Sequence, residues 1–112
     1  MEVKKTSGNL SKMAIYEMTK SPEIQKLSSV EGQILEITDW IIYEDVDSEG
    51  EAREIFSCRT KEGETMASNS PTVIRTFNDI LDCFEPEEIS KIKVVGRKSG
   101  NGRTFYTVTY VG

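Results

Sequence analysis

The sequence contains no histidine among its 112 residues. Because histidine is the commonest general base, its absence excludes serine–histidine and cysteine–histidine nucleophile pairs. Two cysteines, Cys58 and Cys83, are too few for an all-cysteine zinc site, and a mixed cysteine–histidine site is excluded as well. We therefore expect a protein that is not an enzyme and that uses no metal or other cofactor.

Long apolar runs are also absent, so nothing in the sequence predicts a membrane-spanning helix or a signal peptide. Hydrophobic residues make up 37% and charged residues 29% of the chain. These values are typical of one small globular domain. We expect a cytoplasmic protein with no membrane partner, in which both cysteines are reduced and buried.

Charge is distributed unevenly around a net value of −5. Residues 30–90 hold sixteen acidic residues against four basic ones, whereas residues 91–112 hold five basic residues and no acidic one. The chain can therefore have a local basic surface although its net charge is negative, and the net charge does not exclude a nucleic-acid partner.

The N-terminal part reads as a polar lead-in followed by helical segments. We expect residues 1–9 to be disordered and residues 10–112 to form a single domain. Apolar residues at roughly helical spacing from Leu10 to Met18 predict a helical extension. Ser21 and Pro22 have the pattern of an N-cap and first helical residue, which predicts a second short helix.

Five strands and one clear helix are predicted beyond this extension. The strands are expected at residues 33–45, 52–61, 64–69, 89–97 and 103–111. In the first strand the apolar residues change parity, which predicts either a bulge near Asp39 or two halves that bury different faces.

The helix is expected between Ser70-Pro71 and Glu85-Pro86. Its apolar stripe, including Phe77 and Phe84, predicts that it plugs the interior of the fold. The order β-β-β-α-β-β is that of a five-stranded OB-fold barrel, so we predict a mainly β protein of this type with one helix between strands three and four.

Two loops resemble ligand-binding motifs without fulfilling them. Residues 45–50 place acids at alternate positions, but the twelfth position of a calcium loop would be Phe56 instead of glutamate, so we interpret the segment as an acidic hairpin. Residues 96–102 are basic and glycine-rich but lack the P-loop spacing and join two strands. In an OB-fold this second hairpin is one of the loops that clasp oligonucleotides.

Basic and aromatic residues of the strands supply the two elements that binding of single-stranded nucleic acid needs, namely cations for the backbone and rings for stacked bases. The candidate interface consists of Trp40, Tyr43, Arg53, Arg59, Lys61, Lys91, Lys93, Arg97, Lys98, Arg103, Phe105 and Tyr106. Tyr110 is a further aromatic candidate for base stacking.

Several segments carry a resemblance to a known family. They are Met18–Leu27, Glu31–Gln33, Trp40–Asp45, Gly63-Glu64, Ala67–Thr72, Ile74–Phe77 and Gly102–Phe105. Over residues 10–112 the chain resembles small single-stranded DNA-binding proteins of bacteriophages and mobile elements of Gram-positive bacteria. The resemblance implies an OB-type protein that coats replication or recombination intermediates in the host cytoplasm. Many bacterial single-strand binders have an acidic C-terminal tail, whereas this sequence ends in a predicted strand at Tyr110.

The sequence thus predicts a non-enzymatic, sequence-tolerant single-stranded DNA-binding protein. It leaves open whether the chain forms homo-oligomers and whether it contacts replication or recombination proteins. The alternative is an acidic OB-type adaptor or inhibitor that binds a host protein through residues 30–64. Neutralising Asp45, Asp47, Glu49 and Glu51 would damage that alternative, whereas neutralising Lys91, Lys93, Arg97 and Arg103 would damage a DNA binder.

Overall fold

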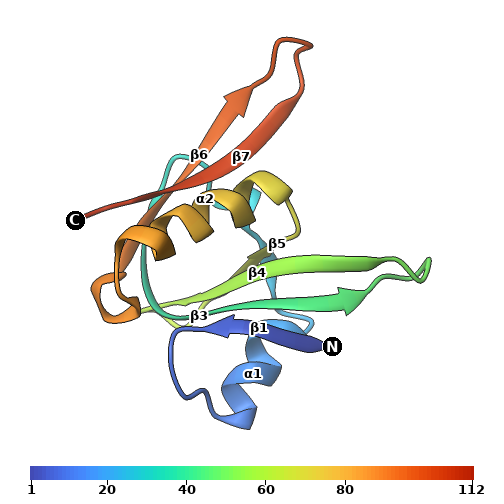
Figure 1. Ribbon diagram of the computed structural model, residues 1–112, viewed down its shortest axis with the longest axis vertical. Coiled ribbons are helices and arrows are strands. Elements are labelled where there is room, and N and C mark those ends of the chain that lie inside the picture. The colour runs from blue at the N-terminus through green and yellow to red at the C-terminus, as the bar shows by residue number, and fades with distance from the viewer.

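The computed structural model describes residues 1–112 and is mainly β, with seven strands and two α-helices (Figure 1). The elements are β1 (Glu2–Thr6), α1 (Lys12–Thr19), β2 (Gln25–Lys26), a 3₁₀ helix (Leu27–Val30), β3 (Ile34–Val46), β4 (Ala52–Thr60), β5 (Thr65–Ser68), α2 (Pro71–Cys83), a 3₁₀ helix (Pro86–Glu88), β6 (Lys91–Lys98) and β7 (Thr104–Tyr110). The prediction of a mainly β chain is confirmed, but the sheet has two strands more than the predicted five. Neither α-helix has the length and apolar character that a membrane crossing requires.

The sheet is curled around β3, its longest strand. Residues 34–36 of β3 pair with β6, residues 37–46 pair with β4, and residues 41–44 pair with β1. The order across the sheet is β2-β5-β4-β3-β6-β7. We expected a barrel whose closure removes the free edges, but β5 and β7 do not pair with each other. The sheet is therefore a half-barrel.

Helix α2 meets the edge of β7 that closure would have covered. Thr72 Oγ1 donates to the carbonyl of Tyr106 over 2.6 Å, and the amide of Val108 donates to Thr76 Oγ1 over 3.0 Å. Two threonine hydroxyls thus satisfy backbone groups that have no strand partner.

A bulge in β3 changes which residues face the core. The register with β4 shifts between Ile37 and Asp39. Before the shift Leu35 and Ile37 face the main core, and after it Trp40 and Ile42 do. Because side chains alternate with a period of two, one extra residue reverses the parity. The predicted bulge near Asp39 is confirmed.

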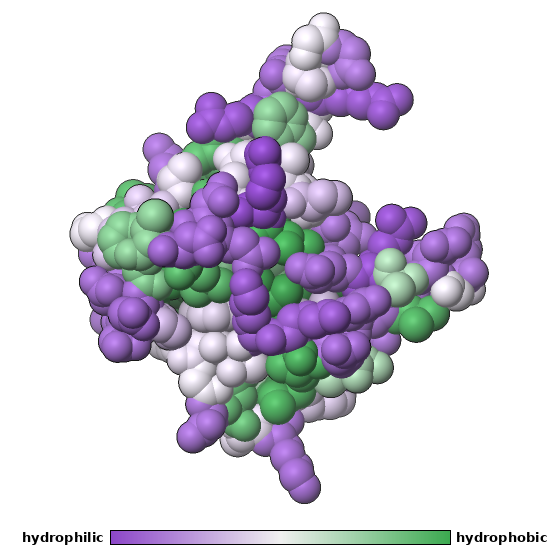
Figure 2. All heavy atoms as spheres, viewed as in Figure 1, coloured by the Kyte–Doolittle hydropathy of each residue, from purple (hydrophilic) through white to green (hydrophobic).

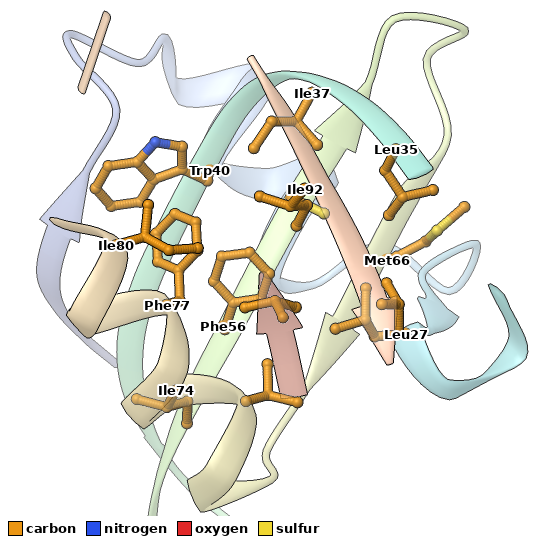
Figure 3. Close-up of a cluster of buried hydrophobic side chains, with 14 of the residues drawn as sticks. Leu27, Leu35, Ile37, Trp40, Phe56, Met66, Ile74, Phe77, Ile80 and Ile92 are labelled. Atoms are coloured by element: carbon orange, nitrogen blue, oxygen red, sulfur yellow. The ribbon is translucent and has the colours of Figure 1, made fainter. Parts of the chain in front are cut away.

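The main core lies between the curled sheet and α2 (Figure 3). Phe77 of α2 is fully buried, and its ring centroid lies 4.9 Å from that of Trp40 and 4.5 Å from that of Phe56. The prediction that Phe77 plugs the interior is confirmed. Phe84 is only half-buried, because it follows the end of the helix and stacks on Tyr110 at a centroid distance of 3.7 Å.

A second, smaller core lies on the other face of β3 and β4. Ala14 and Met18 of α1 pack there against Ile41 and Tyr43, with Ile55 beside them. This explains why β3 has apolar residues on both faces after the bulge. The N-terminal helical segment predicted from Leu10 to Met18 is confirmed as α1.

Three local predictions differ from the structure. Residues 1–9, expected to be disordered, contain β1, whose polar side chains conceal a strand held by backbone pairing to β3. Ser21 and Pro22 form a turn in which Ser21 Oγ accepts from the amide of Glu23, so no α-helix follows. Cys83 is exposed at the end of α2, whereas Cys58 is buried as expected.

The ends of α2 lie where the sequence places them, at Pro71 and Cys83. The hydroxyl of Ser70 does not accept from an amide of the first turn, however, and instead pairs with Thr72 Oγ1 at 2.9 Å. The position of the N-cap was predicted correctly, and its hydrogen bond was not.

Candidate nucleic-acid interface

The β6–β7 hairpin projects from the body of the protein and carries all five basic residues of the C-terminal segment (Figure 1). Arg97 pairs with Phe105 in the register, and Gly96 pairs with Tyr106. Directly opposite residues share a face, so Arg97 and Phe105 lie on one face of the hairpin and Tyr106 on the other. Lys91 and Lys93 share the face of Arg97, whereas Lys98 shares that of Tyr106. Both faces therefore combine a cation with an aromatic ring.

The cations of this hairpin have no acidic partner. None of the eight ion pairs in the structure includes a residue of the hairpin. Lys93, Arg97, Lys98 and Arg103 are exposed, and Lys91 is half-buried. Five positive charges are thus held on one projecting element and are available to an anionic ligand.

The basic residues predicted from β4 and the turn after it are engaged within the chain. Arg59 donates to Asp39 over 2.9 Å and to Glu17 over 2.8 Å, and these partners, Asp39 foremost, raise the pKa of its guanidinium. Arg53 pairs with Asp47 at 3.2 Å, and Lys61 lies 3.8 Å from Glu36. Each of these three predicted site residues thus has a carboxylate partner within the chain, and the partner of Lys61, Glu36, lies directly opposite Lys91 of the hairpin.

The predicted aromatic residues divide into core and surface residues. Trp40 and Tyr43 are 2% and 4% exposed, so neither ring presents a face to a base in this conformation. Burial, together with the nearby Asp45, raises the pKa of the Tyr43 phenol. Phe105 and Tyr106 are half-buried on the hairpin. Tyr110 is half-buried as well, but one of its ring faces is covered by Phe84.

A groove of about 510 Å³ lies between the 3₁₀ helix Leu27–Val30, β5 and the β6–β7 hairpin, which contributes Tyr106 to its lining. The predicted site residue Tyr43 also lines this groove, although its side chain is almost fully buried. Lys26 of β2 and Asn69 of the β5–α2 connection line it as well, and a second hollow of about 500 Å³ between β4 and α2 also includes Asn69. In Figure 2 the surface is hollowed between the two projecting hairpins. Neither Lys26 nor Asn69 is a candidate from the sequence, because no periodicity or charge cluster marks either residue.

The β3–β4 hairpin on the other side of the hollow is acidic. The amides of Glu51 and Glu49 and the guanidinium of Arg53 lower the pKa of Asp47. The ammonium of Lys20, and after it the amide of Val46, lower the pKa of Asp45. The carboxylate of Asp47 thus accepts hydrogen bonds from the backbone of the predicted acidic hairpin and fixes its turn. The β3–β4 and β6–β7 hairpins therefore carry opposite charge.

Comparison with protein families gives one match that spans nearly the whole chain. The family is described as "Phage Single-stranded DNA-binding protein", and its profile matches residues 3–110. No curated protein and no solved structure matches the chain.

Proposed function

The chain belongs to the phage single-stranded DNA-binding protein family, and from this premise we propose that it binds single-stranded DNA through the β6–β7 hairpin and the groove at its base. Its function is to bind single-stranded DNA in phage replication. The half-barrel would then be an OB-type fold, in which the β6–β7 hairpin corresponds to the loop that clasps oligonucleotides.

The observation that carries the assignment of the interface is the absence of ion pairs on the hairpin. Lys91, Lys93, Arg97, Lys98 and Arg103 have no carboxylate within 4.0 Å, although acidic residues outnumber basic ones in the chain. Cations that release counterions when they contact phosphates supply most of the affinity for a nucleic-acid backbone.

The rings of Tyr106 and Phe105 would supply the second part of the affinity. Stacking on an aromatic ring contributes about 1–3 kcal/mol per base and is tolerant of sequence, because every base has a π-face. Binding of this kind suits a protein that coats DNA whatever its sequence. The same activity would serve recombination intermediates in the cytoplasm of the host cell.

We further propose that the protein acts without catalysis. The sequence has no histidine, and neither hairpin carries a nucleophile beside a base. The alternative of an acidic adaptor has no support from the family match, and Asp45 and Asp47 of its proposed surface are engaged by Lys20 and Arg53.

The test is a titration of labelled oligo-dT with the protein at several salt concentrations. We expect binding at low salt and an affinity that falls steeply as salt rises, because phosphate contacts release counterions. Absence of binding at low salt, or an affinity indifferent to salt, would contradict the proposal. Cleavage of the labelled strand in the presence of Mg²⁺ would contradict the non-catalytic part alone.

A further inference from the structure

Gly96 leaves an empty side-chain position that another residue fills. A Cβ built on Gly96 would overlap the carboxylate of Glu31 and would lie 3.1 Å from Glu31 Cγ. The φ angle of Gly96 is not positive, so the backbone does not require glycine here. What the absent side chain provides is space, and the Glu31 carboxylate lies in that space.

This space adjoins the ring that we propose stacks on DNA. Gly96 and Tyr106 are directly paired in the β6–β7 register, so their side-chain positions lie on the same face, roughly 5 Å apart. Tyr106 lines the groove together with Leu27 and Ser28 of the 3₁₀ helix that immediately precedes Glu31. The carboxylate therefore lies on the same face of the hairpin as Tyr106, next to the residue that lines the groove.

Nothing in the structure holds the carboxylate there as an anion. Glu31 is exposed, and its side chain forms none of the side-chain hydrogen bonds or ion pairs in the structure. A site for a phosphate would surround the group with donors. A space beside an aromatic ring in which no donor binds the carboxylate instead fits the face of a nucleobase.

We propose that Gly96 and Tyr106 form a subsite for one nucleobase of single-stranded DNA and that the Glu31 side chain covers this subsite in the free protein. A base that stacks on Tyr106 displaces the carboxylate. The inference rests on the proposed function and adds to it a particular subsite and a competing side chain. Because the side chain is flexible and unpaired, its displacement opposes binding only weakly.

The reach of the side chain separates this mechanism from a simple effect of charge. Glu31→Gln keeps the length of the side chain but removes its charge, whereas Glu31→Ala removes the atoms that lie in the space at Gly96. We expect Glu31→Ala to bind oligo-dT about two- to fivefold more tightly than the wild type, a change smaller than the factor of ten that 1.4 kcal/mol represents. Glu31→Gln should gain less than Glu31→Ala. Glu62→Ala, in the exposed turn between β4 and β5, removes the same charge elsewhere and is the matched control, which should leave the affinity unchanged.

Filling the space with a side chain gives the opposite expectation. Gly96→Val suits a strand and places its methyl groups where the base would lie. We expect the affinity of Gly96→Val for oligo-dT to be about tenfold lower than that of the wild type, as for the loss of one stacked base. The same loss is expected in a double variant that also carries Glu31→Ala, because the valine still occupies the place of the base. Circular dichroism and urea unfolding of each variant show whether the fold is retained.

The outcomes separate this inference from the proposed function. If the wild type fails to bind oligo-dT at low salt, the proposed function fails. If the wild type binds but Glu31→Ala binds no more tightly than Glu62→Ala, the covering role of Glu31 is overturned. An equal gain in Glu31→Gln and Glu31→Ala indicates charge alone and overturns it as well. A folded Gly96→Val variant with wild-type affinity overturns the nucleobase subsite.

Discussion

The guanidinium of Arg59 donates from Nη2 to Asp39 Oδ2 over 2.9 Å, next to the register shift that reverses the parity of β3. The same side chain reaches Glu17 on α1 from Nη1. One arginine of β4 therefore links the bulge to the helix that covers the outer face of the sheet. Both contacts lie within the chain, and we expect this arginine to stabilise the fold instead of contacting DNA.

Replacement of Arg59 by Ala is expected to lower the free energy of unfolding by about 1–2 kcal/mol, because two partly exposed carboxylates lose a charged hydrogen-bond donor. Urea unfolding measures this loss. The salt dependence of binding to oligo-dT should stay as in the wild type. A lower salt dependence in Arg59→Ala would place this arginine on the DNA.

Neutralisation of the β6–β7 hairpin is expected to lower the salt dependence of DNA binding and to leave the stability unchanged, which is the reverse of the pattern for Arg59→Ala. In a variant with Lys93, Arg97, Lys98 and Arg103 all replaced by Gln, the slope of log affinity against log salt should fall by about 0.7 for each phosphate that the protein no longer neutralises. The free energy of unfolding should change little, because no ion pair is removed. A variant with Arg53 and Lys61 replaced by Gln is the control, and an equal fall in its slope would refute the assignment to the hairpin.

Tyr106→Ala is expected to weaken binding to oligo-dT by about 1–3 kcal/mol, because one base loses its stacking partner. Tyr106→Phe keeps the ring and should bind like the wild type. Titration of labelled oligo-dT measures both variants. If Tyr106→Ala binds as tightly as Tyr106→Phe, the ring of Tyr106 does not stack on DNA.

Trp40→Ala, by contrast, should act on stability. Truncation of a buried aromatic residue costs about 3–5 kcal/mol, and Trp40 packs against Phe77 in the main core. Thermal or urea unfolding would show this loss. A folded Trp40→Ala variant of normal stability but reduced affinity for DNA would contradict the core role.

The two cysteines should differ in reactivity. Burial raises the pKa of the Cys58 thiol from 9.0 to about 12, whereas Cys83 is exposed. Because the thiolate is the reactive form, we expect a thiol reagent to modify one cysteine in the folded protein and two in urea. Rapid modification of both thiols in the folded protein would contradict the burial of Cys58.

The same shift makes stability depend on alkaline pH. Between pH 9 and about pH 12 the Cys58 thiol stays protonated in the folded protein and ionises in the unfolded chain. The Cys58 thiol therefore does not lower the free energy of unfolding below pH 9. Above pH 9 the free energy of unfolding falls as the pH rises, by at most about 1.4 kcal/mol per pH unit, because ionisation of the thiol stabilises the unfolded chain. Urea unfolding at pH 8 and pH 10 should therefore show a smaller loss in Cys58→Ala than in the wild type. Equal losses would contradict the shift.

Sequence patterns were sufficient for features that depend on local chemistry. Prolines next to capping positions located both ends of α2, and the parity change in residues 33–45 located the bulge. Strand β1 was missed because its residues are polar and its stability comes from backbone pairing with β3, which no local pattern encodes.

The sequence alone could not show which of the candidate site residues have partners within the chain. Basic residues at alternating positions look alike whether they are paired or free, and pairing depends on distant partners. Glu17 lies 42 residues from Arg59, so the structural role of this arginine was not readable from the sequence. Trp40 was a candidate for stacking because composition does not tell a core ring from a surface ring. The acid-free segment from Lys91 onward required no distant information, and its basic hairpin was anticipated.

The junction of α2 and β7 offers a last prediction, which connects the fold to the site. The Thr76 hydroxyl donates to the carbonyl of Thr72 over 2.8 Å and accepts from the amide of Val108, a residue that is 2% exposed. Thr76→Val keeps the shape but leaves that amide without a partner. We expect a loss of about 1–3 kcal/mol in the free energy of unfolding, whereas Thr76→Ser, which keeps the hydroxyl, should lose much less.

Hydrogen exchange should locate the effect at the edge of β7. In Thr76→Val the amide of Val108 should exchange faster than in Thr76→Ser, because its acceptor is gone. Tyr106 lies two residues away and is tied to the same helix through Thr72. A looser edge should therefore also weaken binding to oligo-dT, with the salt slope unchanged because every cation that neutralises a phosphate is still present. Equal protection of Val108 in the two variants would show that the hydroxyl does not hold this edge. The contact between α2 and the edge of β7 would then depend on side-chain packing alone.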